Sequence, residues 1–404
     1  MFALPGRTPV LFCEIPATAP EAGTVLLYGH YDKQPEFTGW APGLSPWEPV
    51  LRDGRLYGRG GADDGYALFG SLTAIAALQA QGIGHGRCVV LIEGCEESGS
   101  FDLPHYVEAL ADRIGQPDLV ICLDAECGNY DQLWTTTSLR GMAMGVLTVE
   151  VLEQGQHSGA AGGIVPSSFR ILRGIMERIE EASSGRLLPG LYVDIPTDIQ
   201  RQLEHVAQVL GPTVYERFPW AGDTRPQTDD TVELLLNSTW RPSLATVGFS
   251  GAPEVGNAGN TLRPASSVRL AIRLPPPVDA DEATLLIKRE LERDPPYGAT
   301  VRFASQTGQT GWKSPTFAPW LERAMNDASV ANFDKPAMYM GCGGTIPFMK
   351  LLGDAYPGVQ FFVTGVLGPH SNAHGPNEFL EISTGKRVTA CVAAVLAAHA
   401  RQRT

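Results

Sequence analysis

Short apolar runs alternate with longer helical patterns over about the first 130 residues. GTVLLYGH (23–30), RCVVLIEGC (87–95) and DLVICLDAE (118–126) are short and rich in Val, Leu and Ile, which predicts buried strands. Residues 63–82 and roughly 102–114, which lie between these runs, have the length and apolar content of helices. Strand alternating with helix in this way predicts a largely parallel sheet with helices on both faces.

The middle of the chain has a different pattern. Apolar and polar residues alternate over 142–155, 266–277 and 298–305, as in strands with one solvated face. Two helical patterns accompany them, one starting near Pro166 and one after Asp279, which stands three residues before Glu282 as in a capping box. These features predict an antiparallel sheet backed by two amphipathic helices. Residues of about 190–265 are Pro-rich and polar and predict no definite element.

The strand-and-helix pattern returns after residue 311 and ends in an Ala/Val/Leu-rich helix over 382–402. We therefore expect a discontinuous α/β domain formed by residues 1–141 and 312–404. An α+β domain with an antiparallel sheet would be inserted at 142–311.

Composition excludes several classes of protein. The 404 residues include 31 basic and 44 acidic side chains, a net charge of −13, which argues against a nucleic-acid binder and a polybasic membrane-surface protein. No apolar run approaches the roughly 18–20 residues of a membrane span, and the amino end does not have the pattern of a signal peptide. Seven scattered cysteines form no C-x-x-C pair, so we expect reduced thiols in a cytoplasmic protein.

Side chains that bind metals follow the predicted strands. Because ligands bind at the carboxyl ends of strands in open α/β sheets, these side chains should meet in one crevice. Alone, each has an ordinary explanation, as a helix cap, a solvated loop or a core histidine. Together, so many carboxylates would repel one another without a cation, and the mixture of His and carboxylate suits Zn²⁺ or Mn²⁺. The set is His30, Asp32, Asp63, Asp64, Glu96, Glu97, Asp124, His370 and His374.

Six motifs make the sequence recognisable. In order along the chain, they resemble motifs of the M20 family of dinuclear zinc peptidases, which includes carnosinase-like dipeptidases, aminoacylases and desuccinylases. The resemblance covers nearly the whole chain. The motifs are HYD (30–32), GRGGADDG (58–65), EGCEESGS (93–100), LDAE (123–126), QHSG (156–159) and HGPNE (374–378).

The resemblance implies a role for each metal-site residue. Asp63, joined to Asp64 by a cis peptide bond, would bridge two Zn²⁺ ions, for which Mn²⁺ or Co²⁺ could substitute. His30 and Asp124 would complete one site, and Glu97 and His374 the other, with His374 preferred to His370. Asp32 would orient His30, and Glu96 would be the general base that takes a proton from the attacking water.

The inserted domain resembles the family's lid and dimerisation domain. His157 matches a residue that reaches the active site of the partner subunit, which implies a homodimer. Asn260 and Arg273 match substrate-binding positions of the lid, Arg273 as a ligand of the substrate carboxylate. Gly344 and Thr345 belong to GGTIP (343–347), which resembles a loop that binds the same carboxylate in the dipeptidases.

Some positions distinguish among subfamilies, and some depart from the pattern. Asp124 favours the members that act on free amino ends, where deacylases use Glu. Cys342 replaces a Glu of the dipeptidases, Ala160 replaces an Asp, and only 29 residues precede His30. We expect an enzyme that hydrolyses dipeptides or short peptides. An N-acyl-amino-acid amidohydrolase is the alternative, and an inactive metal-binding homologue is disfavoured because Glu96 is present.

Overall fold

A central sheet of five strands carries the candidate ligands. The computed structural model describes residues 1–402, and no helix among them is long and apolar enough to cross a membrane. The three strands predicted near the amino end form the middle of the sheet in parallel, and a fourth parallel strand follows them. An antiparallel edge strand that the apolar pattern did not predict completes it. The order is β1 (Leu11–Ile15), β5 (Arg87–Glu93), β2 (Thr24–His30), β6 (Pro117–Cys122) and β16 (Gln360–Val363).

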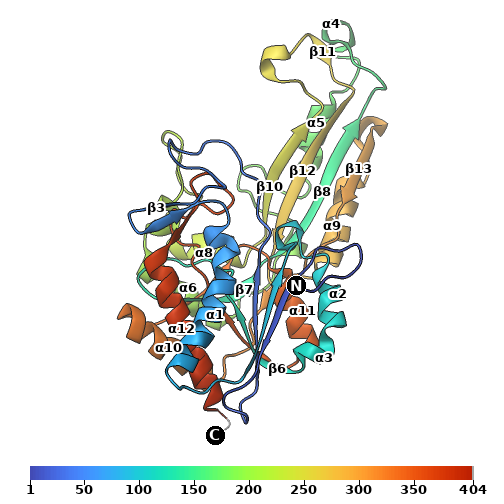
Figure 1. The fold of residues 1–404 in the computed structure, drawn as a ribbon. Coiled ribbons are helices and arrows are strands. Elements are labelled where there is room, and N and C mark those ends of the chain that lie inside the picture. The colour runs from blue at the N-terminus through green and yellow to red at the C-terminus, as the bar shows by residue number, and fades with distance from the viewer. Residues whose placement is uncertain (403–404) are drawn as a thin grey trace.

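Helices cover both faces of this sheet (Figure 1). Alternate residues of β2 enter different cores, Val25 and Leu27 on one face and Leu26 and Tyr28 on the other, as the two-residue period of a strand requires. The predicted fold class is therefore confirmed. One face carries α1 (Tyr66–Ala80), α10 (Pro319–Phe333) and α12 (Ile382–Ala400), and the other carries α2 (Leu103–Ala109), α3 (Ala111–Ile114) and α11 (Pro347–Ala355). The single helix predicted over 102–114 is thus two short ones.

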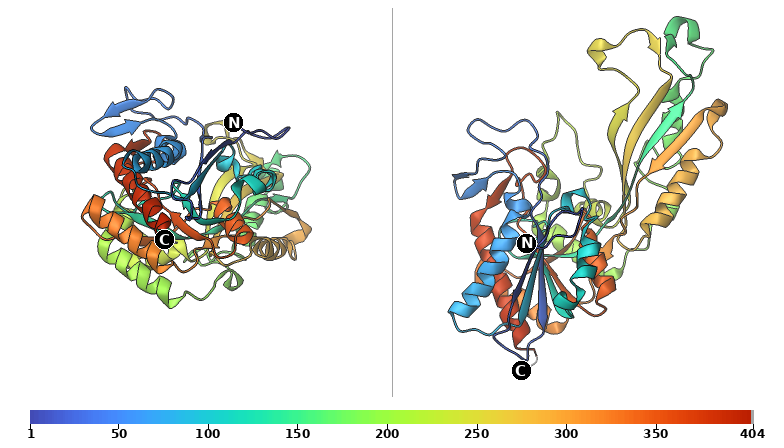
Figure 2. Two further views of the ribbon diagram at one scale, coloured as in Figure 1. Left: turned by 60° about the horizontal axis from the view of Figure 1, so that its bottom comes forward. Right: turned by 45° about the vertical axis from the view of Figure 1, so that its right-hand side comes forward.

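The central sheet and the helices that cover it form what we call the body. A four-stranded antiparallel sheet projects from the body as a separate layer, seen most clearly in the right-hand view of Figure 2. Its two predicted helices pack on one face around a core that includes Leu147, Leu270 and Ile287. The Asp279 side chain caps the second helix by accepting hydrogen bonds from two backbone N–H groups. The elements are β10 (Ser243–Ser250), β12 (Ala265–Leu274), β8 (Gly141–Glu150), β13 (Thr300–Ser305), α5 (Ser168–Met176) and α9 (Ala280–Glu292). We call this layer the lid.

The segment without a clear sequence pattern contributes three helices and the lid's edge strand β10. The helices do not join the lid core. They pack with Trp134 and Met340 in a core of their own beside a small mixed sheet. The inserted domain at 142–311 stays a prediction, and within it these helices have a core separate from that of the lid. The elements are α6 (Thr197–Leu210), α7 (Thr213–Glu216), α8 (Thr231–Thr239), β7 (Trp134–Leu139), β14 (Trp312–Lys313) and β15 (Met338–Cys342).

Two small sheets complete the fold. One lies in the body and consists of β3 (Val50–Arg52), β4 (Arg55–Tyr57) and β17 (Phe379–Glu381). The other pairs β9 (Gln156–His157) with β11 (Thr261–Leu262), next to the single-turn helix α4 (Ser158–Ala161). Figure 1 places α4 and β11 at the end of the lid farthest from the central sheet. We call this part the lid tip.

We predict that Gly365→Ala destabilises the protein by about 1–3 kcal/mol, the range for overpacking a filled site. A Cβ atom at position 365 would lie 1.9 Å from the carbonyl oxygen of Ala125, and neither backbone segment can yield easily. Gly174→Ala is the matched control, because its Cβ in α5 would meet no atom within 4 Å and Ala favours helix by roughly 0.5–1 kcal/mol. Urea unfolding measures both, and equal stability of the two variants would contradict the prediction.

Candidate metal centre

Five segments bring acidic and imidazole groups to one edge of the central sheet. His30 is the last residue of β2, and Asp124 lies two residues beyond β6. Glu97 belongs to the turn η2 (Glu96–Ser98), which follows β5, and Asp63 to the turn η1 (Gly61–Gly65), which leads into α1. Because β2, β5 and β6 are parallel, their carboxyl ends lie together. The fifth group, His374, comes from the loop before β17.

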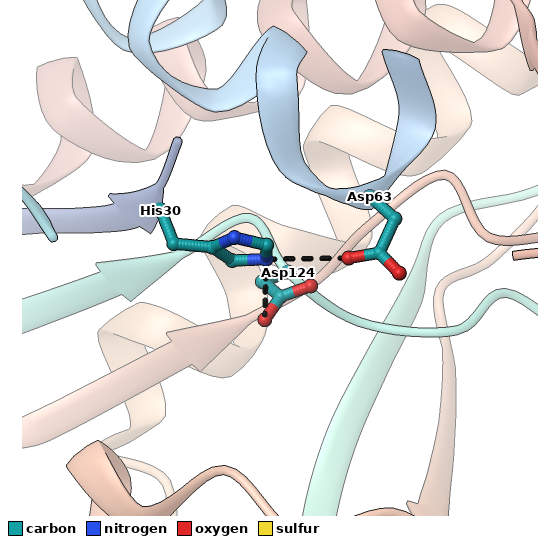
Figure 3. Close-up of side chains that lie close together, drawn as sticks. All are labelled: His30, Asp63 and Asp124. Carbon is teal, nitrogen blue, oxygen red and sulfur yellow. Dashed lines mark hydrogen bonds and ion pairs between the residues drawn. The ribbon is translucent and has the colours of Figure 1, made fainter. Parts of the chain in front are cut away.

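Asp63 stands between two groups of potential ligands. Its Oδ1 is 3.2 Å from Nε2 of His30, which is also 3.7 Å from Oδ2 of Asp124 (Figure 3). Its Oδ2 is 3.0 Å from Nε2 of His374, which is 3.3 Å from Oε2 of Glu97. The structure therefore joins two triads through one carboxylate, with one oxygen turned to each. His374 belongs to the second triad and His370 does not.

These distances fit a pair of divalent ions. Two donors about 2.0–2.1 Å from a tetrahedral zinc lie roughly 3.3–3.4 Å apart. The separations of 3.0–3.7 Å between the donor atoms lie around that value. The donors are imidazole nitrogens and carboxylate oxygens without sulfur, as in catalytic rather than structural zinc sites. The residues present thus fit the two metals that the sequence predicts.

The charges in the crevice act strongly on one another. Burial opposes ionisation of Asp63, but hydrogen bonds with His30 and His374 outweigh it and hold the pKa of Asp63 below its usual range. Burial likewise disfavours a charged His30, but the nearby carboxylates, Asp124 first, raise its pKa far above the usual value. Hydrogen bonds with Asp63 and Glu97 raise the pKa of His374 to about 10. The site is thus arranged for positive charge between its carboxylates.

Asp32 orients two parts of the centre at once. Its Oδ1 is 3.4 Å from Nδ1 of His30, on the opposite side of the ring from the ligating nitrogen. The same carboxylate accepts hydrogen bonds from the backbone N–H groups of Glu96 and Glu97, at 3.1 and 3.0 Å. The Asp32 side chain therefore fixes both the orientation of the His30 imidazole and the position of the turn that carries Glu96 and Glu97.

Glu96 lies beside the cluster without belonging to either triad. Burial, and then the charge of Asp124, raise the pKa of Glu96 well above its usual value. Asp64 follows Asp63 across a cis peptide bond and is fully buried, with Oδ2 accepting a hydrogen bond from the backbone N–H of His30. Burial and the charge of Asp124 also raise the pKa of Asp64. The proposed bridging ligand Asp63 thus has a lowered pKa, whereas its acidic neighbours Asp64 and Glu96 have raised pKa values.

Sequence reasoning missed the side chains that anchor the loops. Arg59, in GRGG, donates a hydrogen bond to Glu378, in PNE, in a fully buried ion pair of 2.5 Å. Arg59 also donates to the carbonyl oxygen of Gly375, next to His374. Gln34 donates to both carboxylate oxygens of Glu97. These residues lie inside or beside the motifs, but nothing in their spacing indicates that residues 59 and 378 are partners.

Two of the expected lid residues lie away from this centre. His157 is exposed in β9, and its Nδ1 accepts a hydrogen bond from the backbone N–H of Gly159. The Asn260 carbonyl accepts a hydrogen bond from the N–H of Ser158, so both belong to the lid tip. Figure 1 shows the lid tip far from the strand ends of the same chain.

The other expected substrate residues lie where the lid joins the body. Arg273, near the end of β12, donates to Oγ1 of Thr345 at 3.1 Å, and this hydroxyl donates to the carbonyl of Arg140. The N–H of Gly344 donates to the Cys342 sulfur. Burial lowers the pKa of Arg140 to about 10, with Arg273 contributing. Two half-buried or buried guanidinium groups beside a glycine-rich loop form a site suited to a carboxylate.

Several known proteins are similar to this chain in sequence or in fold. Two relatives are a cysteinylglycine-S-conjugate dipeptidase of Corynebacterium striatum and the human Beta-Ala-His dipeptidase, 27% and 28% identical. The matches cover 89% and 70% of this chain and 78% and 56% of the relatives, so the chain spans little more than half of the human protein. Similar solved structures include the dipeptidase Dug1p of Saccharomyces cerevisiae, with a TM-score of 0.82 over 99% of this chain and 86% of that one.

Human carnosine dipeptidase 1 is also similar, with a TM-score of 0.79 over 97% of this chain and 83% of that one. At 22% identity both structural likenesses concern the fold. The model of Peptidase family M20/M25/M40 matches residues 26–398, almost the whole chain. The resemblance drawn from the six motifs is thereby confirmed, and the chain belongs to peptidase family M20/M25/M40.

Proposed function

We propose that the protein hydrolyses the amide bond of dipeptides or short peptides with the help of two divalent metal ions, preferably Zn²⁺. The observation that carries this proposal is the pair of triads joined through Asp63, with Glu96 beside them and outside both. The two relatives described above are both named as dipeptidases. Their names support this substrate class and do not favour the deacylase alternative.

Asp63 would hold both ions, His30 and Asp124 the first, and Glu97 and His374 the second. Bound there, the ions would supply Lewis acidity that polarises an amide carbonyl and makes water more acidic. The Glu96 carboxylate would take the proton of the attacking water and give it to the leaving amine nitrogen. Asp32 would keep the His30 ring and the Glu96 turn in place. Arg273, with Gly344 and Thr345, would bind the substrate carboxylate.

We further propose that the active protein is a homodimer in which the lid tip serves the partner's site. His157 and Asn260 are polar, exposed and adjacent, yet they lie away from the centre of their own chain. From a second copy, the His157 imidazole could donate a hydrogen bond to the oxyanion that forms during hydrolysis. We also propose a cytoplasmic location, since all seven cysteines are free thiols and six are buried.

We predict that Asp63→Ala loses both metal ions and that His374→Ala loses one of two, because only Asp63 belongs to both triads. Elemental analysis of zinc-loaded, dialysed protein measures the ion content. Asp131→Asn is the control, since Asp131 is an exposed carboxylate paired with Lys335 outside the crevice. Two ions retained by Asp63→Ala would refute its role as the bridge.

We predict that Glu96→Gln keeps its metal content but loses about 10²–10⁴-fold in kcat on dipeptides, the usual loss when a general base is removed. The amide preserves the size of the side chain and cannot accept the proton. Glu108→Gln, an exposed change on α2, should have no effect. A kcat within twofold or threefold of the unchanged enzyme would rule out Glu96 as the base.

Mixed dimers test the role of the lid tip. His157→Ala and Glu96→Gln proteins should each be nearly inactive alone. Mixed, they should recover up to one working site per heterodimer, because one site then has an intact Glu96 and receives an intact His157 from the partner. Activity after subunit exchange is the measurement. Absence of recovery in verified heterodimers would mean that His157 does not act across an interface.

A further inference from the structure

A cleft of about 840 Å³ lies beside the small mixed sheet, and its lining includes Glu126, two residues beyond the predicted metal ligand Asp124. Its walls come from the end of β15, from the segment that follows β6, and from the stretch that carries α7 and α8. Polar and aromatic groups mix along it. The residues that line the cleft include Glu126, Arg140, Arg217 and Gly343.

Glu126 is held at a defined position in this cleft. It lies two residues beyond the predicted ligand Asp124, and its backbone forms a parallel bridge with Leu367. The neighbouring Cys127 N–H donates to the carbonyl of Leu367 at 3.1 Å, and the Leu367 N–H donates to Ala125. The side chain remains 38% exposed. A carboxylate is therefore presented next to the metal centre by a backbone that is fixed on both sides.

The groups around Glu126 leave its charge available. The nearest cation is Arg217, whose Nη1 lies 3.9 Å from Oε2, beyond hydrogen-bond length, and 34% of the Arg217 side chain is exposed. Such loose and exposed ion pairs contribute little and are readily exchanged. Burial first and the Glu126 charge second raise the pKa of Cys342, which precedes the lining residue Gly343, to about 12, so that thiol is neutral. Glu126 shares the cleft with Gly343, the first residue of the loop that leads to Gly344 and Thr345.

The positions of the two guanidinium groups and of the Glu126 carboxylate match the opposite charges at the two ends of a free dipeptide. Arg273 and Arg140 supply positive charge where the lid meets the loop, and Glu126 supplies negative charge nearby. An unmodified dipeptide carries one carboxylate and one ammonium group, whereas an N-acylated amino acid carries only the carboxylate. Binding the latter would bury Glu126 in the cleft without the cation that compensates its charge.

We propose that Glu126 binds the ammonium group of the substrate and so makes the enzyme select peptides with a free amino end. This inference rests on the proposed peptidase function and identifies its specificity-determining residue. Position 342, where the dipeptidases that this chain resembles have a Glu, holds a buried, uncharged Cys next to the lining residue Gly343. Glu126 provides a carboxylate to the same cleft from another strand end.

Two matched substrates isolate the ammonium group. Ala-Ala and N-propionyl-alanine differ only in that a hydrogen replaces the ammonium. We expect zinc-loaded enzyme to have a kcat/KM at least about tenfold higher for Ala-Ala, because a site that supplies a charged partner for the ammonium group disfavours an analogue that leaves this partner unpaired. Glu126→Gln should lower kcat/KM for Ala-Ala about tenfold or more and leave that for N-propionyl-alanine unchanged or higher. β-Ala-Ala, in which the amine is one carbon farther away, shows whether Glu126 reads an α- or a β-ammonium.

Two further variants separate binding from simple ion pairing. Arg217→Gln should keep or increase the preference for Ala-Ala, because it removes the cation that competes with the substrate. Asp131→Asn removes an exposed carboxylate from the same segment outside the cleft and should not change the preference. Zinc content confirms that each variant retains the metal centre.

The outcomes distinguish this inference from the proposed function. If the unchanged enzyme hydrolyses neither dipeptide, the peptidase function itself fails. If it hydrolyses Ala-Ala and Glu126→Gln has the same ratio of kcat/KM values, the role of Glu126 is overturned. An equal loss of preference in Arg217→Gln would also overturn it, because Glu126 would then act through its ion pair.

Discussion

Concentrated negative charge at the ends of three parallel strands is the constraint on which this structure depends. Asp63, Asp124 and Glu97 approach one another at the same edge of the sheet, with Asp64 and Glu96 beside them. Carboxylates this close cannot all be ionised unless positive charge lies between them. The imidazoles of His30 and His374, whose pKa values the carboxylates raise, can carry part of this charge, and divalent ions bound between the same groups would carry more. The site is therefore built for cations.

A second layer of interactions keeps these charges in place. Asp32 ties the end of β2 to the turn after β5, and the buried Arg59–Glu378 pair ties the turn before α1 to the loop of His374. A buried ion pair contributes little net stability after its desolvation cost, but the loss of one partner would leave an unpaired buried charge. The Arg59–Glu378 pair thus contributes mainly by holding two segments in position. It joins segments that are 319 residues apart at the point where Asp63 and His374 must meet.

The centre and the substrate-binding groups are on different parts of the molecule. The ends of the central strands supply His30, Glu97 and Asp124, whereas Asp63 comes from the turn before α1 and His374 from a loop of the same body. Arg273 enters from the base of the lid, and His157 and Asn260 lie at the lid tip. Ligands carried by rigid elements of a scaffold are held more precisely than ligands on loops, whereas recognition of a substrate benefits from a part that can approach it. The cleft that contains Glu126 is lined by residues of both the body and the lid, among them Gly343 and Leu244 of β10.

The sequence by itself determined the elements whose periodicity is strong and the groups that follow them. The three buried strands, the helix before Gly82, the long final helix and the alternating strands of the lid all follow from local apolar patterns. The ligands could be identified because parallel strands place their carboxyl ends together, and the motif order named the family. Tertiary structure alone decided what depends on distant partners. Leu110 divides a predicted helix, α6–α8 pack against the body, and β10 forms as an edge strand with exposed residues and little apolar pattern. The pairing of Arg59 with Glu378 and the placement of Glu126 and Gly343 in one cleft also depend on tertiary structure, because spacing along a chain carries no information on which loops meet.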